Sequence, residues 1–529
     1  MKLVKISADS VQIRTDLAEF RGIRINDLLS VSDGTVSLVA MVTGLTDTDP
    51  EERIGDEDFL GDITGIKTID CSIIGSLKQG RFMKAINEYP TTNVQIGRIG
   101  ADEFASMLCQ GRRGFRIGSY AAYGCDAMVD GSLFFQRHSC IVGNTGSGKS
   151  ETVAKILEEA AKLPGANLVV FDIHGEYSSL SYASNIRIGE EFPLPIWMFG
   201  FQDMVSNILK IREETATTAM TALRKAYYTV CPFGKENRPA YFDYRQLIEV
   251  IEKMDSQVIS TGEVYKTGEK AGCAKTTKGE YNGKLTGVVN LLNDRLLDSR
   301  YQFLFAEEPQ EYLYYVADSI LGTGKPVKNI DLSEVPHDVA IPIIGLLSRL
   351  IFDLQRIRGR EEPHPVVLVC DEAHVYIPEA LLLSASQRRM AEVFEDIAKE
   401  GRKFGVTLFA ATQRPSELNR TILAQCANMI VGKLNNENDK LMIKGMLPDG
   451  DAGLVDSVAM FQPGEVLIVG DAVQVPLKIK VDLAQERPVS RTIDVWDIWS
   501  RETESDIRGL VDEYLGEDRF MDAGFTEVD

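Results

Sequence analysis

The stretch that most constrains the fold of this chain is IVGNTGSGKSETVAKILEE, residues 141–159. It fits the pattern G-x-x-x-x-G-K-[ST] and lies between an apolar run and a segment with helical periodicity, which is the setting that this motif requires. Glycines in such a loop allow backbone N–H groups to turn inward at the start of a helix, where they bind phosphate. The stretch therefore predicts a strand, a phosphate-binding loop and a helix in succession.

The residues of this loop predict a nucleoside triphosphate as the ligand, with Mg²⁺ beside it. In loops of this kind the lysine, here Lys149, neutralises β- and γ-phosphate oxygens, and the serine, here Ser150, binds the metal ion. The other positions that we expect at the nucleotide are Gly143, Asn144, Thr145, Gly146, Ser147, Gly148 and Glu151. The alternative is a glycine-rich turn that only caps an ordinary helix.

A second motif, VVLVCDEAH, ends an apolar run with Asp371 and Glu372. An acid at the carboxyl end of a buried strand can hold the Mg²⁺ shell, and a second carboxylate beside it can polarise the attacking water. We therefore assign Asp371 to the metal and Glu372 to the role of catalytic base. The pair could instead cap the next helix, but the phosphate loop elsewhere in the chain favours the metal site.

Hydrolysis also needs positive charge opposite the departing phosphate, and Arg402 is the first candidate. It follows a helical segment whose apolar stripe is formed by Met390, Val393, Phe394 and Ile397. Arg402 could complement the helix dipole, worth roughly 0.3 to 1 kcal/mol, or act as an arginine finger, worth roughly 10³ to 10⁵ in rate. The spacing alone favours the first interpretation.

Two further strand ends carry polar residues. Gln413 ends the apolar run GVTLFAATQ, where it could sense the γ-phosphate or simply terminate the strand. Asp172, His174 and Glu176 follow another apolar run in FDIHGEY. These three could reach the same site or could stabilise a turn, and the sequence leaves both alternatives open.

The pattern of the chain changes along its length. Residues 1–115 consist of short alternating runs with Gly- and Asp-rich turns, which predict a small β-barrel or sandwich. From about residue 135, short continuous apolar runs alternate with amphipathic segments, which predict an α/β domain built on buried parallel strands. The long stretch before HPVVLVCDE has mostly helical patterns, so we expect a helical insertion there.

Composition excludes several classes of protein. The net charge of −21 requires any nucleic-acid contact to come from a local basic surface. Eight scattered cysteines without a C-x-x-C pair argue against zinc and against a disulfide framework. No window reaches the roughly 18 apolar residues of a membrane helix, and the N-terminus lacks the apolar core of a signal peptide, so we expect a cytoplasmic protein.

In their order along the chain, six motifs resemble the HerA family of hexameric DNA translocases, close to the FtsK branch of P-loop ATPases. They are RHSCIVGNTGSGKS, FDIHGEYSSL, LPIWMF, CDEAHVYIP, AKEGRKFGVTLFAATQRPSELNRTILAQCANMIVGKL and GEVLIVGD. The resemblance implies ATP as the nucleotide, Arg402 acting on the neighbouring subunit's nucleotide, Arg137 as a second active-site arginine, and Asp172 as an active-site acid.

The resemblance also implies an organisation in five parts. We expect an N-terminal β-barrel at 1–115, the first part of a RecA-like core at 116–199, a helical insertion at 200–335, the second part of the core at 336–484, and a C-terminal brace with an acidic tail at 485–529.

Two functional hypotheses follow from the resemblance. In the first, a homohexamer threads double-stranded DNA as a motor, with Arg388, Arg389 and Lys440 as candidate basic contacts. Its partner is a NurA-like nuclease, or another effector such as a sirtuin-like NADase in defence against phage. In the second, ATP assembles a ring scaffold that activates the effector, which the acidic composition favours. The missing membrane helix argues against a membrane-anchored pump.

Overall fold

The computed structural model describes residues 1–48, 66–91, 93–108, 113–211, 217–232, 234, 238–267, 269, 272–359, 361–379, 385–447, 453–489, 495–500 and 507–515. The chain forms two compact units, Met1–Val489 and Ser490–Asp529. Within the described residues, no helix is both long enough and apolar enough to cross a membrane.

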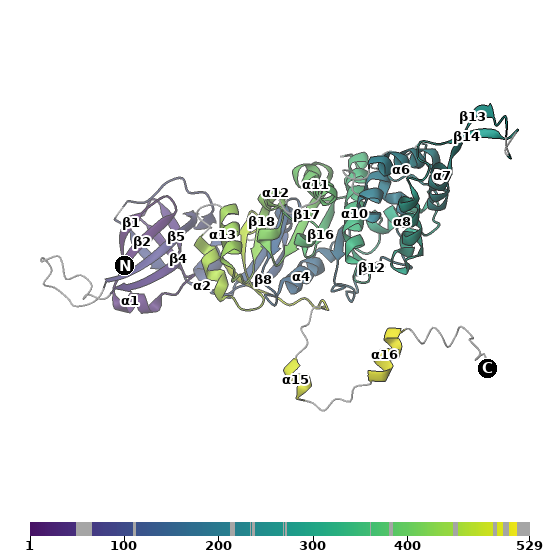
Figure 1. Cartoon of the computed structure of the whole chain (residues 1–529). Helices are drawn as coiled ribbons and strands as arrows, with labels where there is room; N and C mark the ends of the chain where they lie inside the picture. The colour runs from purple at the N-terminus through teal and green to yellow at the C-terminus, as the bar shows by residue number, and fades with distance from the viewer. Residues whose placement is uncertain are drawn as a thin grey trace. The chain divides into compact units, whose positions relative to one another are not determined.

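The N-terminal part is an antiparallel sheet of seven strands (Figure 1). Its strands are β1 (Lys2–Ile6), β2 (Ser10–Thr15), β3 (Leu28–Ser32), β4 (Ser37–Thr48), β5 (Ile66–Lys78), β6 (Arg81–Met83) and β7 (Gln95–Arg98). They follow the order β1-β2-β5-β4-β3-β7, with β6 on β5. The strands are accompanied by two short helices, α1 (Leu17–Gly22) and α2 (Ala101–Met107). The end strands β1 and β7 do not pair in the part described, so closure into a barrel stays a prediction.

A sheet of eleven strands forms the centre of the first unit, in the order β12-β15-β11-β16-β17-β10-β18-β19-β20-β8-β9. From β12 to β18 neighbouring strands are parallel, and from β18 to β9 they are antiparallel. The strands are β8 (Gly114–Tyr120), β9 (Asp126–Asp130), β10 (His138–Val142), β11 (Leu168–Asp172), β12 (Ala183–Arg187), β15 (Val327–Asp331), β16 (Val366–Cys370), β17 (Val406–Thr412), β18 (Cys426–Val431), β19 (Glu465–Gly470) and β20 (Lys478–Val481).

This strand order determines where the sequence motifs meet. The strand of the phosphate loop, β10, lies between β17 and β18, and the strand of the acidic motif, β16, lies on the other side of β17. The carboxyl ends of β11, β16, β17 and β10 therefore share one edge of the sheet, where ligands bind in folds of this type. The predicted α/β class with a RecA-like P-loop core is confirmed.

The apolar runs of the sequence form the expected strands, with one difference. GEVLIVGD forms β19, which pairs antiparallel with β18, although such runs are typical of parallel strands. Both faces of β19 are nevertheless covered, because Val466, Leu467, Ile468 and Val469 are all buried. A continuous apolar run therefore predicts that both faces of a strand are buried, but it does not predict whether the strand is parallel or antiparallel to its neighbours.

Helices cover the sheet on both sides in the view of Figure 1, with α4 (Lys149–Ala161) on one side and α11 (Ala385–Glu400) and α12 (Arg420–Gln425) on the other. The stripe predicted for α11 is buried at Val393, Phe394 and Ile397, which pack into the core. The side chain of Met390 lies outside the described residues. The long helix α10 (His337–Arg358) packs against α11.

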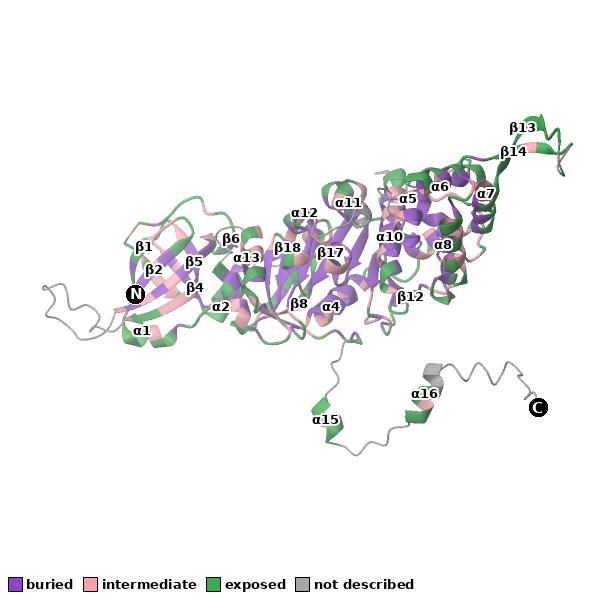
Figure 2. Ribbon diagram, in the orientation of Figure 1, coloured by how far each residue is buried: buried purple, intermediate pink, exposed green. Residues whose placement is uncertain are grey.

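Helices are the commonest elements in the described part of the predicted insertion, although β15 near its end belongs to the central sheet. The insertion contains α5 (Gly200–Asp203), a π-helix over Met204–Ile208, α6 (Thr217–Val230), α7 (Tyr244–Ser256), α8 (Thr286–Leu297) and α9 (Tyr312–Leu321). Between α7 and α8 a hairpin pairs β13 (Val258–Val264) with β14 (Ala274–Lys278), and Figure 2 shows it as almost entirely exposed. Because neither strand of the hairpin buries an apolar face, the sequence lacks the apolar alternation from which strands are predicted.

The second unit contains two short helices, α15 (Val495–Trp499) and α16 (Ile507–Leu515). Trp496 and Trp499 on α15 are exposed, at 80% and 78%. The role of this segment as a brace stays a prediction.

Asn428 on β18 connects two backbone segments near the edge of the sheet at which the parallel strands begin, and its substitution tests the contribution of these hydrogen bonds to stability. Its buried side-chain Nδ2 donates to the carbonyl of Leu133 at 3.1 Å, and its Oδ1 accepts the N–H of Ala472 at 2.9 Å. Asn428→Leu leaves both backbone groups unpaired, so we expect a loss of about 2 to 4 kcal/mol in the free energy of unfolding. Urea denaturation measures this loss, and Asn435→Leu at an exposed position is the control. Equal stability of both variants would contradict the assignment.

Candidate nucleotide-binding site

The phosphate loop joins the end of β10 to the start of α4. Gly146 and Gly148 adopt left-handed backbone angles, with φ of 75° and 93°. At Gly148 the space is restricted as well, because an added Cβ would lie 2.9 Å from the backbone nitrogen of Gly464. The two glycines thus produce the reversal that brings Lys149 to the first turn of the helix, as the motif predicts.

Backbone hydrogen bonds fix the loop to the neighbouring strands. The N–H of Asn144 donates to the carbonyl of Lys433 at 2.9 Å, and the N–H of Ser147 donates to the carbonyl of Asn144 at 3.0 Å. On the other side, the N–H of Gly464 donates to the carbonyl of Ser147 at 2.9 Å. The loop is therefore shaped before any ligand binds.

Four predicted residues from three segments meet at the carboxyl edge of the sheet. The Lys149 Nζ lies 3.2 Å from Glu372 Oε1, and each side chain is only 8% exposed. The Gln413 amide donates to the same Glu372 oxygen, and its own oxygen accepts the hydroxyl hydrogen of Thr145. The structure thus joins the phosphate loop, the acidic motif and the end of β17 in one hydrogen-bonded network.

Glu372 has an unusual backbone for a residue with a side chain. Its angles, φ 44° and ψ 45°, are left-handed, a conformation that costs energy and is concentrated at functional sites. The turn aims the Glu372 carboxylate at Lys149 rather than along the strand direction. Nearby, His374 Nδ1 lies 3.3 Å from Glu372 Oε2, and burial lowers the pKa of His374, so this imidazole is neutral at pH 7.

Asp371 is buried beside this network. Burial raises its pKa to about 7, and the carboxylates of Glu372, Glu176 and Asp172 add to the rise, while Lys149 opposes it. Four carboxylates around one lysine leave a net negative charge at this edge. A divalent cation bound here would neutralise this excess of negative charge.

Buried polar atoms without hydrogen-bond partners test whether the site fits a nucleotide with Mg²⁺. They include Ser147 Oγ in the phosphate loop, Glu372 Oε2, Glu176 Oε2 and the hydroxyl of Tyr177. Native proteins leave few such atoms, and each one calls for a ligand or another explanation. Their position around the loop and the acidic edge fits phosphate oxygens and a hydrated metal ion. The roles of Ser150, Glu151 and the remaining loop residues stay predictions.

The two predicted arginines lie at the opposite edge of the sheet. Arg402 precedes β17 and Gln413 follows it, and this seven-residue strand spans about 23 Å. Arg137 precedes β10, whose five residues span about 16 Å before the phosphate loop. The charge of Arg402 acts on His138 at the start of β10, so both arginines share this edge. Neither can reach the phosphate loop of its own chain.

Arg402 is exposed on the turn Gly401–Phe404, and Arg137 forms an ion pair with Asp471. Among the candidate basic contacts, Arg388 is exposed, whereas Lys440 is buried and paired with Glu437. The side chain of Arg389 lies outside the described residues. The structure thus supports an accessible position for Arg388 and argues against Lys440 as a surface contact.

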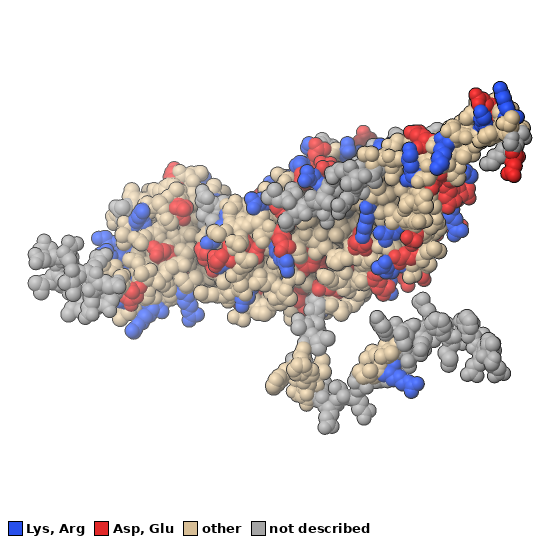
Figure 3. Space-filling view, viewed as in Figure 1, with Lys and Arg blue, Asp and Glu red and all other residues tan. Residues whose placement is uncertain are grey.

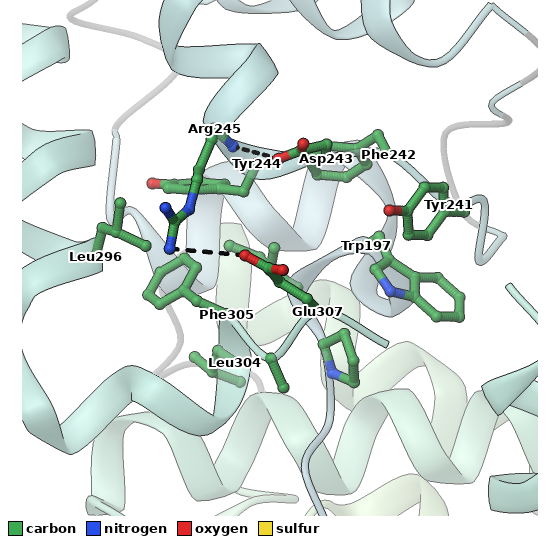
Figure 4. A pocket seen from close by; sticks show the side chains of 13 residues that line it. Trp197, Tyr241, Phe242, Asp243, Tyr244, Arg245, Leu296, Leu304, Phe305 and Glu307 are labelled. Atoms are coloured by element: carbon green, nitrogen blue, oxygen red, sulfur yellow. Dashed lines mark hydrogen bonds and ion pairs between the residues drawn. The ribbon is translucent and has the colours of Figure 1, made fainter. Parts of the chain in front are cut away.

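A cavity in the insertion is distinct from this site. Figure 4 shows it between Trp197, Tyr241, Tyr244, Phe305 and Glu307, and none of the residues that line it belongs to the phosphate loop or the acidic motif. Its volume of about 120 Å³ has room for several waters.

Comparisons with known proteins agree with the geometry. A family model described as "Helicase HerA, central domain" matches residues 115–351. The chain is 26% identical over 422 residues to "DNA double-strand break repair helicase HerA" of Saccharolobus solfataricus, covering 77% of this chain and 75% of that protein. It is 28% identical over 451 residues to the protein of the same name from Sulfurisphaera tokodaii, covering 82% and 81%.

Among solved structures, the chain is similar to VirB4 of Thermoanaerobacter pseudethanolicus, with 17% identity and a TM-score of 0.49 over 72% of this chain and 98% of that one. The sheet order and the Lys149–Glu372 network define an ATP-hydrolysing enzyme of the P-loop class. The family model and the sequence relatives show that the chain is similar to HerA helicases.

The buried acid gives a prediction on pH. Because the folded-state pKa of Asp371 is raised from 3.8 to about 7, its charged form destabilises the protein, and stability is lost progressively as pH rises between these two values. Asp371→Asn removes this charge, so we expect it to raise the Tm at pH 8 and to raise it less at pH 5. Thermal unfolding without nucleotide measures this, with exposed Asp294→Asn as control. A Tm difference independent of pH would contradict it.

Proposed function

We propose that this enzyme is an ATP-driven motor that moves along double-stranded DNA as a ring of six copies. The observation that carries the proposal is the division of the site between two edges of one sheet. The phosphate loop and the acidic motif lie at the carboxyl edge, and Arg402 and Arg137 lie at the amino edge. Relatives named as DNA repair helicases support DNA as the substrate.

A ring follows from this division. If the arginines act on a nucleotide, they act on that of another copy, so the amino edge of one chain must face the carboxyl edge of the next. Such a head-to-tail contact uses two different surfaces, and repeating it produces a closed ring when the rotation allows closure. Six copies is the number that the family resemblance implies.

The proposed chemistry assigns each residue a role. Lys149 and the loop N–H groups bind the phosphates of ATP, while Ser150 and Asp371 hold Mg²⁺, which neutralises charge on the phosphates. A phosphate at Lys149 replaces Glu372 as its counter-charge, which frees Glu372 to accept a proton from the attacking water. Gln413 orients that water.

DNA contact in this proposal depends on a local surface. Lys and Arg are interspersed with Asp and Glu on the face shown in Figure 3, with no continuous basic stripe. A net charge of −21 repels DNA at long range. We therefore place the DNA contacts in the channel of the ring, where six copies of a few cations such as Arg388 act together.

The second candidate is a ring scaffold. Here ATP assembles the ring, which holds and activates an effector, either a NurA-like nuclease in DNA end processing or a sirtuin-like protein in defence against phage. The acidic composition and the mixed charges of Figure 3 favour this alternative. We propose the N-terminal sheet as the surface that binds the effector in either case.

The rate of ATP hydrolysis separates the two candidates. For the motor, we expect linear duplex DNA to stimulate hydrolysis, and the stimulation to fall steeply between 50 and 200 mM salt, because phosphate contacts release counterions. Steady-state ATPase assays across this range measure it, with Lys149→Ala as the inactive control. An ATPase rate that is the same with and without DNA at every salt concentration would favour the scaffold.

Mixed rings test the shared site. We expect Arg402→Ala to keep nucleotide binding and to lose hydrolysis by roughly 10³ to 10⁵ fold, and Glu372→Gln to lose hydrolysis as well. Mixing the two inactive variants creates interfaces with an intact Glu372 on one copy and an intact Arg402 on the next, so ATPase activity should return.

Arg356→Ala, which removes an exposed arginine of α10, is the control and should keep the wild-type rate. If mixed rings form, as shown by native mass spectrometry, and no activity returns, the assignment of Arg402 to the neighbouring site is wrong.

A further inference from the structure

The turn that follows β11 is closed by Asp172. Its Oδ1 accepts the N–H of Glu176 at 3.0 Å, its Oδ2 accepts the N–H of Tyr177 at 2.9 Å, and the Asn329 amide donates to Oδ2 at 3.3 Å. The side chain of Asp172 is fully buried. Gly175, with φ 70°, allows the chain to reverse within the turn. Both carboxylate oxygens of Asp172 are therefore engaged in shaping this turn.

The turn lies directly beside the metal edge of the site. Strands β11 and β16 are parallel neighbours, and Phe171 is in register with Cys370. The next residues along the two strands are Asp172 and Asp371, which places the turn after β11 next to the acid assigned to Mg²⁺.

Two side chains of this turn bring unpaired polar atoms to that edge. The Tyr177 ring is fully buried and its hydroxyl has no hydrogen bond of good geometry, and Glu176 Oε2 is buried without a partner as well. The groups that act on the Tyr177 hydroxyl are Asp371, Glu176, Asp172 and Ser150. The hydroxyl thus faces both residues assigned to the metal.

The far side of the turn is also held. The N–H of Val489 donates to the carbonyl of Glu176 at 2.7 Å, and Glu486 accepts the N–H and the hydroxyl hydrogen of Ser181. The turn is therefore fixed between Asp172 and the segment that follows β20. A turn fixed on both sides keeps the Glu176 and Tyr177 side chains in place without a ligand.

An unpaired buried polar group destabilises a protein, so two of them in a fixed turn need a compensating partner. Mg²⁺ usually keeps several of its waters, and these waters need hydrogen-bond partners from the protein. A carboxylate oxygen accepts from such a water, and a phenol hydroxyl can accept or donate. This chemistry matches what the turn presents.

We propose that Glu176 and Tyr177 are positioning residues that hydrogen-bond to the waters of the Mg²⁺ held by Ser150 and Asp371. Asp172 serves the site by holding the turn that carries them. The inference rests on the proposed Mg²⁺ site and is independent of DNA movement and of ring size. The alternative is that Tyr177 only fills space in the core.

The test compares nucleotide affinity with and without Mg²⁺. Fluorescent ADP is titrated into the full-length protein in MgCl₂ and in EDTA, and the ratio of the two Kd values gives the gain from the metal. For Tyr177→Phe and Glu176→Gln we expect this gain to fall roughly 10- to 100-fold, the range for residues that orient metal ligands, with the affinity in EDTA unchanged.

Tyr227→Phe is the matched control, because Tyr227 is also fully buried with an unpaired hydroxyl but lies on α6 in the insertion. It should keep the full gain. Asp172→Asn, which leaves one N–H of the turn without an acceptor, should reduce the gain in the same direction as Tyr177→Phe.

The inference is wrong if Tyr177→Phe and Glu176→Gln keep the wild-type gain, or if affinity falls equally in MgCl₂ and in EDTA, which indicates a packing role. If the wild-type protein itself shows no gain from Mg²⁺, the metal assignment of Ser150 and Asp371 fails instead. The two failures are therefore distinguishable in one data set.

Discussion

The site depends on the buried ion pair between Lys149 and Glu372. Two charges removed from water are costly unless each has a close partner, and separating them would leave an uncompensated charge in the interior. The pair forms only because β17 holds β10 and β16 at a fixed register, with Val142 opposite Thr412 and Cys370 opposite Ala410. Glu372 is the counter-charge of Lys149 in the structure, and in the proposed mechanism a bound phosphate takes its place.

The direction of the parallel strands explains the proposed assembly. The carboxyl ends of the parallel strands all lie at the edge that carries the phosphate loop. A loop that follows one of these strands is therefore close to the nucleotide site, whereas a residue that precedes a strand lies at the opposite edge of the sheet. Arg137 and Arg402 both precede strands, and His138 at the same edge is held neutral by burial, which lowers its pKa to about 4. In the proposed assembly, the arginines of a second copy of the chain supply the positive charge beside the phosphate.

Much of the site could be predicted from sequence because its motifs are local. The phosphate loop and the acidic motif each predict the end of the strand that precedes them. The apolar runs along the chain predict the fold class. Contacts across the sheet could not be predicted, because the sequence does not contain the strand order. The hydrogen bond between Thr145 and Gln413 exists only because β17 is the neighbour of β10.

Strand β15 shows a second limit of sequence patterns. Its sequence VKNID carries a lysine and an asparagine, yet all five residues are buried. Lys328 Nζ donates to Asn167 Oδ1 at 3.0 Å and the Asn329 amide nitrogen donates to Asp172, so these two donors are paired by residues distant in sequence. Such a strand lacks the apolar run by which its neighbours are found. Tyr177 was missed for a similar reason, since no spacing rule marks a tyrosine after a turn.

The central claim is that each ATP is hydrolysed between two copies of this chain. The most direct measurement is the turnover per chain on serial dilution, recorded together with particle mass by mass photometry. The account predicts that turnover falls in step with the loss of assembled particles. Constant turnover in particles of a single chain would contradict it.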